Sequence, residues 1–306
     1  LALYPQIIMN RQKKINVFLI GGRGFIGKNI IEQLGKRYII FSPSHSELDL
    51  QDREKVEEFF KTHIIDIVIH AANVGGNRRD QFIPNMLMTN LKIFFNLARC
   101  DKYIKKMIFL GCGAEYDKTR ELKKIKETDF DFMVPQDDYG FYKYICSKYI
   151  EKSDKIINLR LFGIYGKYED YERRFISNAI CKNIFNLPIT MRQNVFFDYL
   201  YIDDFVKIVD YFISNDCKYK FYNIGRGKKI DLLTIANLVN DASANKSEII
   251  VRRRGLKKEY TCDNSRLVDE IRNLHFTDFE ETVKELYAWY KSIKSSLSIK
   301  SFLVDK

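Results

Sequence analysis

The sequence predicts an α/β fold in which a doubly wound parallel sheet is followed by a smaller α/β cap. Short apolar runs alternate with segments of helical spacing through the first half of the chain. The runs are apolar at nearly every position, as expected for parallel strands that are covered on both faces. After Phe162 this alternation becomes irregular, which indicates a second architecture that is joined without a sharp linker.

Five strands and four helices are predicted in the first half. The strands are assigned to short apolar runs, Asn16–Ile20, Tyr38–Phe41, Ile67–His70, Met107–Leu110 and Ile157–Phe162. The helices are assigned to longer segments whose apolar residues recur three or four positions apart, Phe25–Leu34, Arg53–Lys61, Asn85–Ala98 and Tyr142–Glu151. Because strands and helices alternate, we expect the strands to form one parallel sheet with helices on both faces.

The second half gives fewer regular signals. We predict helices at Arg174–Phe185, Asp204–Ser214 and Leu232–Asp241, and a strand at Phe197–Ile202. Residues 12–162 are therefore assigned to the first domain and residues 163–290 to the cap, with residues 200–215 returning to the first domain. Residues 291–306 are rich in Ser and Lys, and we expect this tail to fray.

Composition excludes several classes of protein. Lys and Arg number 51 against 40 Asp and Glu, and the net charge of +11 indicates anionic partners or a solvated basic surface. The six cysteines include no Cys-x-x-Cys pair and the four histidines are scattered, so we expect neither a zinc site nor a disulfide framework. Free thiols suit a reducing cytoplasm. No apolar run approaches the ~20 residues that cross a bilayer, so no membrane partner is expected.

The segment GGRGFIG joins the first predicted strand directly to the first predicted helix. Glycines at Gly21, Gly24 and Gly27 allow a tight turn, a close approach of the backbone to a pyrophosphate, and close packing of the helix on the sheet. The helix N-terminus adds free N–H groups and the positive end of a dipole. We therefore predict a Rossmann-type dinucleotide site. Its other predicted contacts in this loop are Arg23, Phe25 and Ile26.

The end of the second strand distinguishes NAD from NADP. NAD-binding proteins usually carry an acid there for the ribose 2′-hydroxyl. This strand ends instead in Phe41-Ser42-Pro43-Ser44, and Arg23 lies in the glycine loop. A hydroxyl at Ser42 and a guanidinium suit a 2′-phosphate, so we predict NADP (NADPH), with NAD as the alternative if Arg23 only faces solvent. Asp49 and Leu50 are expected to cover the adenine.

Tyr139 and Lys143 lie four residues apart and therefore on one face of a helix. A lysine ammonium beside a phenol favours the phenolate and lowers the tyrosine pKa, which makes the tyrosine a usable general acid or base. The pair Tyr144–Lys148 has the same spacing. We prefer Tyr139 because the turn at Pro135–Asp138 places it at the start of a helix.

These motifs, in this order, resemble the extended short-chain dehydrogenase/reductase family of nucleotide-sugar epimerases, dehydratases and reductases. The resemblance covers about residues 14–290. It rests on GGRGFIG, HAAN at His70–Asn73, the strand end at Cys112, Tyr139–Lys143, RLFGIYG at Arg160–Gly166, YIDD at Tyr201–Asp204 and YNIGRG at Tyr222–Gly227. Within the family the chain is most similar to GDP-L-fucose synthase, through SELDLQD, HAANVGG and FLGCGAEYDK.

The resemblance implies hydride transfer between a nicotinamide and a carbon of a sugar nucleotide. Tyr139 would give a proton to a 4-keto oxygen, and Lys143 would orient the ribose and tune Tyr139. Cys112 would stand where the family carries a Ser or Thr hydroxyl. Further cofactor contacts are implied at Ala71, Ala72, Phe162 and Ile164.

Two departures from GDP-L-fucose synthase concern its acid–base pair for C3/C5 epimerisation. The resemblance places Ala114 and Arg174 at those positions, and neither side chain exchanges a proton at working pH. We therefore expect a reductase that does not epimerise. A 4,6-dehydratase is disfavoured because Gly113 and Ala114 stand where its acidic pair is expected.

Two further departures concern the grip on the substrate. Gly163 and Phe197 replace an Asn and an Arg that the resemblance leads us to expect. Arg192, or Arg254 of the run RRRG, is expected to bind the diphosphate instead, unless the run is a solvated face. The predicted substrate-binding residues are Asn73, Ala114, Arg174, Arg192 and Arg254.

We therefore predict NADPH-dependent reduction of the C4 keto group of a nucleotide-activated sugar, of the GDP-4-keto-deoxysugar or heptose type, in surface polysaccharide biosynthesis. The alternatives are a C4 epimerase that retains NAD and a non-catalytic dinucleotide-binding regulator. We expect a homodimer through the helices at 85–98 and 142–151, and neither a nucleic-acid partner nor a metal. His70, at a strand end, is expected to be structural rather than catalytic.

Overall fold

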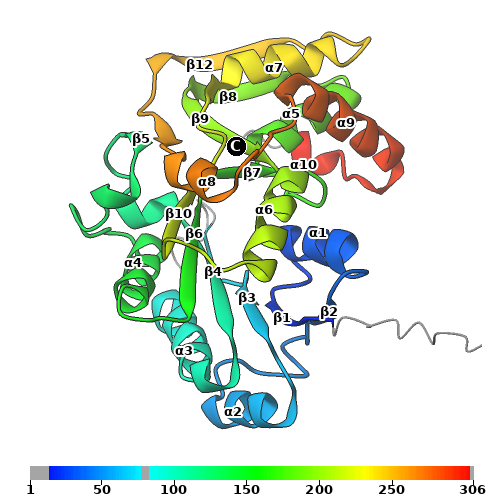
Figure 1. The fold of residues 1–306 in the computed structure, drawn as a ribbon. Helices are drawn as coiled ribbons and strands as arrows, with labels where there is room; N and C mark the ends of the chain where they lie inside the picture. The colour runs from blue at the N-terminus through cyan, green and yellow to red at the C-terminus, as the bar shows by residue number, and fades with distance from the viewer. Residues whose placement is uncertain (1–13, 77–82, 304–306) are drawn as a thin grey trace, which may run out of the picture.

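The computed structural model describes residues 14–76 and 83–303. It confirms the predicted α/β class, because Figure 1 shows a central sheet with helices on both faces and a cap over one end of the sheet. Residues 12 and 13 of the predicted first domain and residues 304–306 of the predicted tail lie outside the described residues.

The central sheet has six strands in the order β10-β6-β4-β3-β1-β2, and every neighbouring pair is parallel. Its strands are β1 (Asn16–Ile20), β2 (Ile39–Phe41), β3 (Ile67–His70), β4 (Lys106–Cys112), β6 (Ile156–Leu161) and β10 (Phe221–Ile224). Five of them agree with predicted strands to within two residues. The sixth, β10, was not predicted, because Asn223 interrupts its apolar run FYNI.

Alternate side chains of the sheet enter two separate cores. Along β1, Val17 packs in the core of one face and Phe18 in the core of the other. The first face is covered by α1 (Phe25–Leu34) and α6 (Ile202–Ser214), and the second by α2 (Arg53–Thr62), α3 (Met86–Ala98) and α4 (Asp138–Ile150). The sheet is therefore doubly wound, as the sequence predicts.

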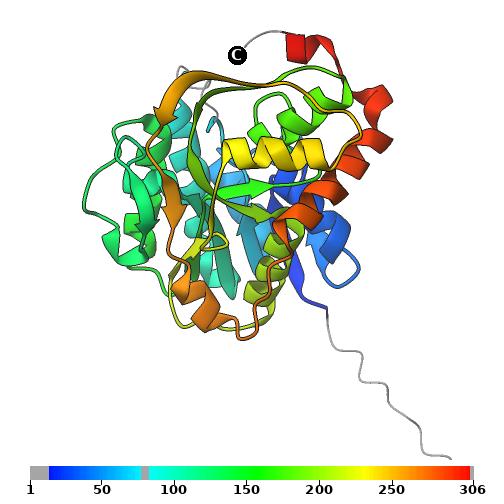
Figure 2. The ribbon, with the colours of Figure 1, turned by 90° about the horizontal axis from the view of Figure 1, so that it is seen from above.

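The cap holds two small sheets and a group of helices, which Figure 2 shows from above. β8 (Ile189–Asn194) pairs in parallel with β12 (Ile249–Leu256). The other sheet has the order β11-β9-β13-β5, and β7 also pairs with β9. Its strands are β5 (Leu122–Ile125), β7 (Gly163–Tyr165), β9 (Phe196–Tyr201), β11 (Lys229–Asp231) and β13 (Tyr260–Cys262). The remaining cap helices are α5 (Phe175–Ile184), α7 (Leu232–Asp241), α8 (Ser265–Glu270), α9 (Phe279–Ser292) and α10 (Lys300–Leu303).

The chain crosses between the central sheet and the cap more than once. β5 precedes residue 162 yet belongs to a cap sheet, whereas α6 and β10 follow it yet join the central layers. The α6 contact is polar as well as apolar, since the Tyr38 hydroxyl donates to Asp210 Oδ1 at 2.5 Å. The end of the chain is also packed: Phe302 is buried against Tyr171 and Phe185, with ring centroids 5.6 and 5.8 Å apart. The aromatic side chain of Phe302, in the predicted tail, therefore joins the core.

Three further features bear on the class of protein. All six cysteines are free. Within residues 14–76 and 83–303, no helix combines the length and apolar character needed to span a membrane. The same residues contain no cluster of three or more His, Cys, Asp or Glu side chains arranged to hold a metal ion.

Candidate active site

The carboxyl ends of β1, β3 and β4 meet at the edge of the central sheet that faces the cap. β1 lies between β2 and β3, so the winding of the chain reverses between β1 and β3. Ligands of such sheets bind outside the carboxyl ends of the strands at this switch point. The loops after β1 and β3 touch here, because a Cβ built on Gly21 would lie 2.9 Å from the amide nitrogen of Ala72.

The glycine loop has the shape of a phosphate-binding turn. Gly21 has a φ of +91°, and a Cβ built on Gly27 would lie 2.2 Å from the Gly21 carbonyl oxygen. Gly24 is the N-cap of α1 and has no side chain to engage the N–H groups of the first turn, which leaves them for an anion. The loop therefore fits a dinucleotide pyrophosphate. Beside it, Arg23 is exposed and Phe25 and Ile26 are half-buried.

The Ser42 side chain lies against this loop, since a Cβ built on Gly22 would lie 2.1 Å from Ser42 Oγ. Glu47, which the sequence did not single out, accepts hydrogen bonds from the Ser44 N–H at 2.6 Å and the Ser44 hydroxyl at 2.7 Å. These bonds, with a smaller contribution from the charge of Arg23, hold the pKa of Glu47 below its ordinary value. A 2′-phosphate bound here would therefore share Arg23 with a carboxylate.

The other predicted cofactor residues lie around the same edge. Asp49 Oδ1 accepts from the Gln51 N–H at 2.9 Å, and the Leu50 carbonyl accepts from Asn96 Nδ2 at 2.9 Å. Ala71 and Ala72 follow β3 directly, Phe162 lies between β6 and β7, and Ile164 is the middle residue of β7.

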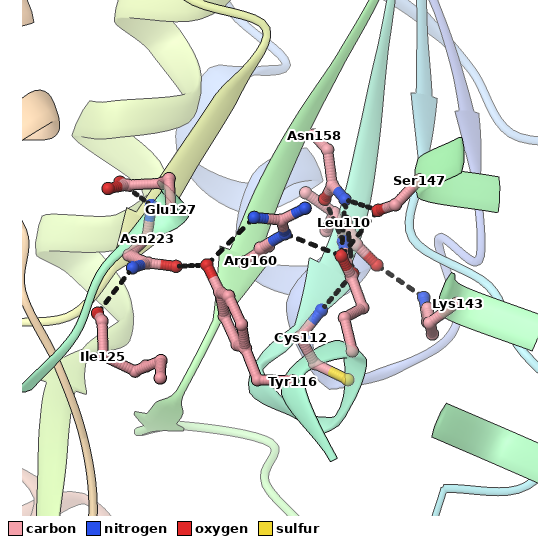
Figure 3. Close-up of polar contacts among 12 residues, drawn as sticks. Leu110, Cys112, Tyr116, Ile125, Glu127, Lys143, Ser147, Asn158, Arg160 and Asn223 are labelled. Carbon is pink, nitrogen blue, oxygen red and sulfur yellow. Dashed lines mark hydrogen bonds and ion pairs between the residues drawn. The ribbon is translucent and has the colours of Figure 1, made fainter. Parts of the chain in front are cut away.

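Helix α4 places Tyr139 and Lys143 at this edge. It begins at Asp138, four residues before the predicted start, because Asp137 caps it by accepting from the Gly140 N–H at 3.1 Å. Lys143 is buried, and its Nζ donates to the Leu110 carbonyl in β4 at 2.6 Å (Figure 3). The Tyr139 ring packs on Gly76, where a Cβ would lie 2.7 Å from a ring carbon.

The net shift of the Tyr139 pKa is opposite to the lowering that was expected from Lys143. The pKa of Tyr139 is raised well above 10.0, first by burial and then by the neighbouring Cys112 thiol. Lys143 Nζ lies 6.0 Å from the Tyr139 ring centroid and is held by a carbonyl, and burial lowers its own pKa. Tyr139 is therefore a protonated phenol near neutral pH, suited to act as an acid.

Cys112 ends β4 beside Tyr139. Burial raises the pKa of its thiol, so the thiolate that a nucleophile needs is disfavoured. Its N–H donates to Glu115 Oε1 at 3.0 Å. Glu115 is completely buried and accepts from Arg160 Nε at 2.7 Å and from the Ser147 hydroxyl at 2.6 Å. This network, which includes Asn158 and continues through Tyr116 to Asn223, ties β4, α4, β6 and β10 together (Figure 3).

The alternative pair, Tyr144–Lys148, is engaged elsewhere. The Tyr144 hydroxyl and Lys148 Nζ both donate to Asp131, and the lysine lies 3.0 Å from the carboxylate. Lys148 also lies 2.8 Å from Glu151. Of the two pairs, the one adjacent to Cys112 is therefore Tyr139–Lys143.

The predicted substrate residues are less closely gathered. Arg174 is the exposed N-cap of α5, and its charge counteracts the rise in the pKa of Tyr139. Asn73 is exposed and donates to the Gly75 carbonyl at 2.6 Å, whereas Ala114 is buried. Arg192 and Arg254 are exposed on β8 and β12 of the cap, away from the carboxyl edge of the central sheet.

Tyr260, at the start of β13, is a site residue that the sequence did not predict. A Cβ built on Gly113, the residue after Cys112, would lie 2.4 Å from the Tyr260 hydroxyl oxygen. Its segment, KKEYTC, carries no motif that indicates a role. His70, by contrast, packs between Phe94 and Phe109, and burial lowers its pKa to about 3, so it is neutral.

Comparison with known proteins finds relatives along most of the chain. GDP-L-colitose synthase of Yersinia pseudotuberculosis is 25% identical over 304 residues, which cover 91% of this chain and 94% of that protein. GDP-L-fucose synthase of Azorhizobium caulinodans is 26% identical over 258 residues, which cover 76% of this chain and 81% of that protein.

Solved structures share the fold. A GDP-L-fucose synthetase from Naegleria fowleri bound to NADP has a TM-score of 0.79 at 16% identity, covering 92% of this chain and 94% of that one. A GDP-D-glycero-L-gluco-heptose synthase from Campylobacter jejuni, solved in the presence of NADPH, has a TM-score of 0.80 at 18% identity, covering 91% and 98%.

A family profile, described as the NAD dependent epimerase/dehydratase family, matches residues 17–225. This range is more than half of the chain and runs from β1 to the end of β10. It includes the glycine loop, Cys112 and the Tyr139–Lys143 pair. The chain therefore belongs to the NAD dependent epimerase/dehydratase family.

Proposed function

We propose that the chain is an NADPH-dependent reductase of the C4 keto group of a nucleotide-activated sugar, of the GDP-4-keto-deoxysugar or heptose type. The observation that carries the proposal is the protonated Tyr139 beside Cys112 at the carboxyl end of β4. Reduction of a ketone needs a proton for the oxygen, and a phenol with a raised pKa holds that proton at neutral pH. The GDP-sugar relatives support the substrate class.

The side chains divide the reaction as follows. The glycine loop and α1 bind the pyrophosphate, and NADPH, when bound, supplies the hydride. Tyr139 gives its phenolic proton to the carbonyl oxygen as the carbonyl carbon accepts the hydride. Lys143, held by the Leu110 carbonyl, places a positive charge close to the phenolate that remains. Cys112 adds a weak S–H donor beside the same oxygen.

The reductase is proposed to leave C3 and C5 unchanged. Removal of a proton at these carbons needs an acid and a base that exchange protons near pH 7. Ala114 has no such group, and its side chain is buried. Arg174 keeps its proton at any working pH. Deuterium from solvent at C3 or C5 of the product would contradict this part of the proposal.

The proposal extends to the cofactor and the cellular setting. Ser42 and Arg23 at the glycine loop favour NADPH, although NAD fits the same cradle. Six free thiols suit the cytoplasm, and relatives that make GDP-sugars suggest surface polysaccharide biosynthesis.

We also propose a homodimer through α3 and α4, where Met88 and Tyr149 are exposed apolar side chains. Light scattering in solution tests it, and a monomer at all concentrations would contradict it.

The test of function is a turnover assay with NADPH and a panel of GDP-, CDP-, UDP- and dTDP-4-keto sugars, with both deoxysugars and heptoses among them. Loss of NADPH absorbance with at least one member, together with a product reduced at C4, is the expected result. Cofactor binding without oxidation by any member would exclude the reductase. Interconversion of C4 epimers without net oxidation of NADPH would identify a C4 epimerase instead.

A further inference from the structure

We propose that the Tyr260 hydroxyl donates a second hydrogen bond to the substrate oxygen. It supplies a hydroxyl donor at a place where Cys112 offers only a thiol. The proposal rests on the proposed function, because it adds a group to the same site. Nothing in the sequence around Tyr260 indicates this role, which follows from where the fold places its ring and its hydroxyl.

The backbone of Tyr260 connects the cap to the edge of the central sheet. Tyr260 pairs with Phe197 of β9 on one side and with Leu122 of β5 on the other. Its ring contacts two further rings, with centroids 5.0 Å from Phe162 and 5.9 Å from Phe197. These contacts restrict the ring and therefore the position of its hydroxyl.

That direction is toward the end of β4. The Tyr260 hydroxyl oxygen lies 2.4 Å, and the ring carbon that bears it 2.8 Å, from the position of a Cβ on Gly113. Only glycine leaves this space to the phenol, and Gly113 is joined directly to Cys112. The hydroxyl therefore lies beside the residue that the proposed reaction places at the substrate oxygen.

The pKa shifts of the neighbouring groups agree with this placement. Cys112 is, after burial, the largest influence on the pKa of Tyr260, and Tyr260 in turn raises the pKa of Tyr139. The charge of Arg174 opposes both rises. The two phenols and the thiol therefore lie near one another, within reach of the Arg174 charge.

The Tyr260 hydroxyl is available to a ligand. It makes no hydrogen bond to any of the described residues. It is also not one of the fully buried polar atoms without a partner, so a ligand can reach it. A carbonyl oxygen under reduction gains negative charge and is stabilised by fixed donors. Tyr139 supplies one donor, and Cys112 is a weak second one. A rigid phenol beside Cys112 supplies the stronger second donor for this oxygen.

The test is a double-mutant cycle of Y260F and C112S on the full chain. Y260F should lower kcat about 10-fold or more, as removal of a fixed donor does, with an unchanged KM for NADPH. In the C112S background the introduced serine hydroxyl replaces the lost Tyr260 hydroxyl as a donor. Y260F should therefore lower kcat only about 3-fold or less in that background. Y219F, which removes an exposed hydroxyl elsewhere, is the matched control. Equal losses in both backgrounds, or no loss from Y260F, would overturn the proposal.

A binding measurement separates this proposal from the proposed function. If the wild-type chain turns over a panel member and Y260F does so equally well, only the role of Tyr260 fails. If no member is turned over, calorimetry with NADP-loaded protein and the same panel decides. Weaker binding of a sugar nucleotide by Y260F, with NADP affinity unchanged, would support the Tyr260 contact although the reductase is refuted. Equal binding by both proteins, or no binding by the wild type, would overturn it.

Discussion

Arg160 Nε lies 2.7 Å from Glu115 Oε2, and the two side chains are 1% and 0% exposed. The pair is adjacent to the candidate site, because Glu115 also accepts a hydrogen bond from the N–H of Cys112. Ser147 of α4 donates to the same carboxylate, so one ion pair joins the end of β4 to the helix that carries Tyr139. The buried pair therefore links the stability of the fold to the geometry of the site.

E115Q should destabilise the protein strongly. The substitution leaves the Arg160 guanidinium buried without a counter-charge, which costs about 3 to 5 kcal/mol of unfolding free energy. Urea denaturation followed by circular dichroism measures it. E58Q, a change of an exposed side chain on α2, is the control and should stay within about 0.5 kcal/mol of the wild type. Similar midpoints for the two variants would show that the pair contributes little.

Y139F should abolish most turnover and leave cofactor binding intact. Removal of the phenolic proton donor is expected to lower kcat by about 10²- to 10⁴-fold. Y144F is the matched control, since Tyr144 belongs to the pair engaged with Asp131 and should retain activity. NADPH affinity is measured by fluorescence titration. A Y139F enzyme with near-normal turnover, or an inactive Y144F enzyme, would contradict the assignment.

The pH profile should report the raised pKa of Tyr139. Reduction uses the protonated phenol, which is fully present below its pKa and is lost as the pH rises through it. kcat/KM for reduction should therefore stay level from about pH 6 to about pH 9 and fall only at more alkaline pH. Oxidation of the product alcohol needs the phenolate and should rise with pH. A fall of the reduction rate near pH 7 would indicate that the pKa of the proton donor is lowered rather than raised.

Cofactor preference should depend on Arg23 and Glu47 in opposite directions. R23A removes the cation proposed to face the 2′-phosphate and should weaken NADPH binding about 10-fold while NADH binding stays constant. E47Q removes the carboxylate near Arg23 and should strengthen NADPH binding a few-fold. Titration of each variant with both cofactors measures this. Parallel changes for NADPH and NADH would show that neither residue faces the 2′-position.

Glu169 should make the cap less stable as the pH rises. Burial raises the pKa of Glu169 to about 8 from an ordinary 4.5, and its carboxyl group is hydrogen-bonded to Ser177 at 2.6 Å. Between these values the folded state keeps a proton that the unfolded state has lost, so stability falls with pH across this window. E169Q keeps the contact without the charge, and its Tm should exceed that of the wild type by several degrees at pH 8 but hardly at pH 5. An equal difference at both pH values would contradict this.

Helices and strands whose bounds are defined by their own residues could be predicted from the sequence. β1, β3 and α7 have the predicted bounds, because apolar spacing and turn residues define them locally. β5, β10 and β13 were missed, since polar residues interrupt their sequences LKKI, FYNI and YTC and leave no continuous apolar run. α4 begins earlier than predicted, because the cap at Asp137 outweighs the polar character of its first turn.

Order along the chain indicated that Cys112 and Tyr139 lie close together, and the fold brings them next to each other. The hydrogen bond from Lys143 to the Leu110 carbonyl was not predicted. The direction of the Tyr139 pKa was wrong because burial, which no motif encodes, outweighs the lysine. Arg160 within the apolar run IINLRL did carry a signal, since an ionisable residue in a buried strand requires a partner. Tyr260 carried none.

The pairing of β5 with β13 has a consequence for protein engineering. Lys124 N–H donates to the Thr261 hydroxyl across 137 residues of chain, so the sheet of the C-terminal half is completed by a strand from the N-terminal half. A fragment that stopped at residue 162 would leave β5 unpaired and would lack β10 at the sheet edge. A chimera that exchanges caps between relatives therefore has to transfer residues 122–125 together with the C-terminal half.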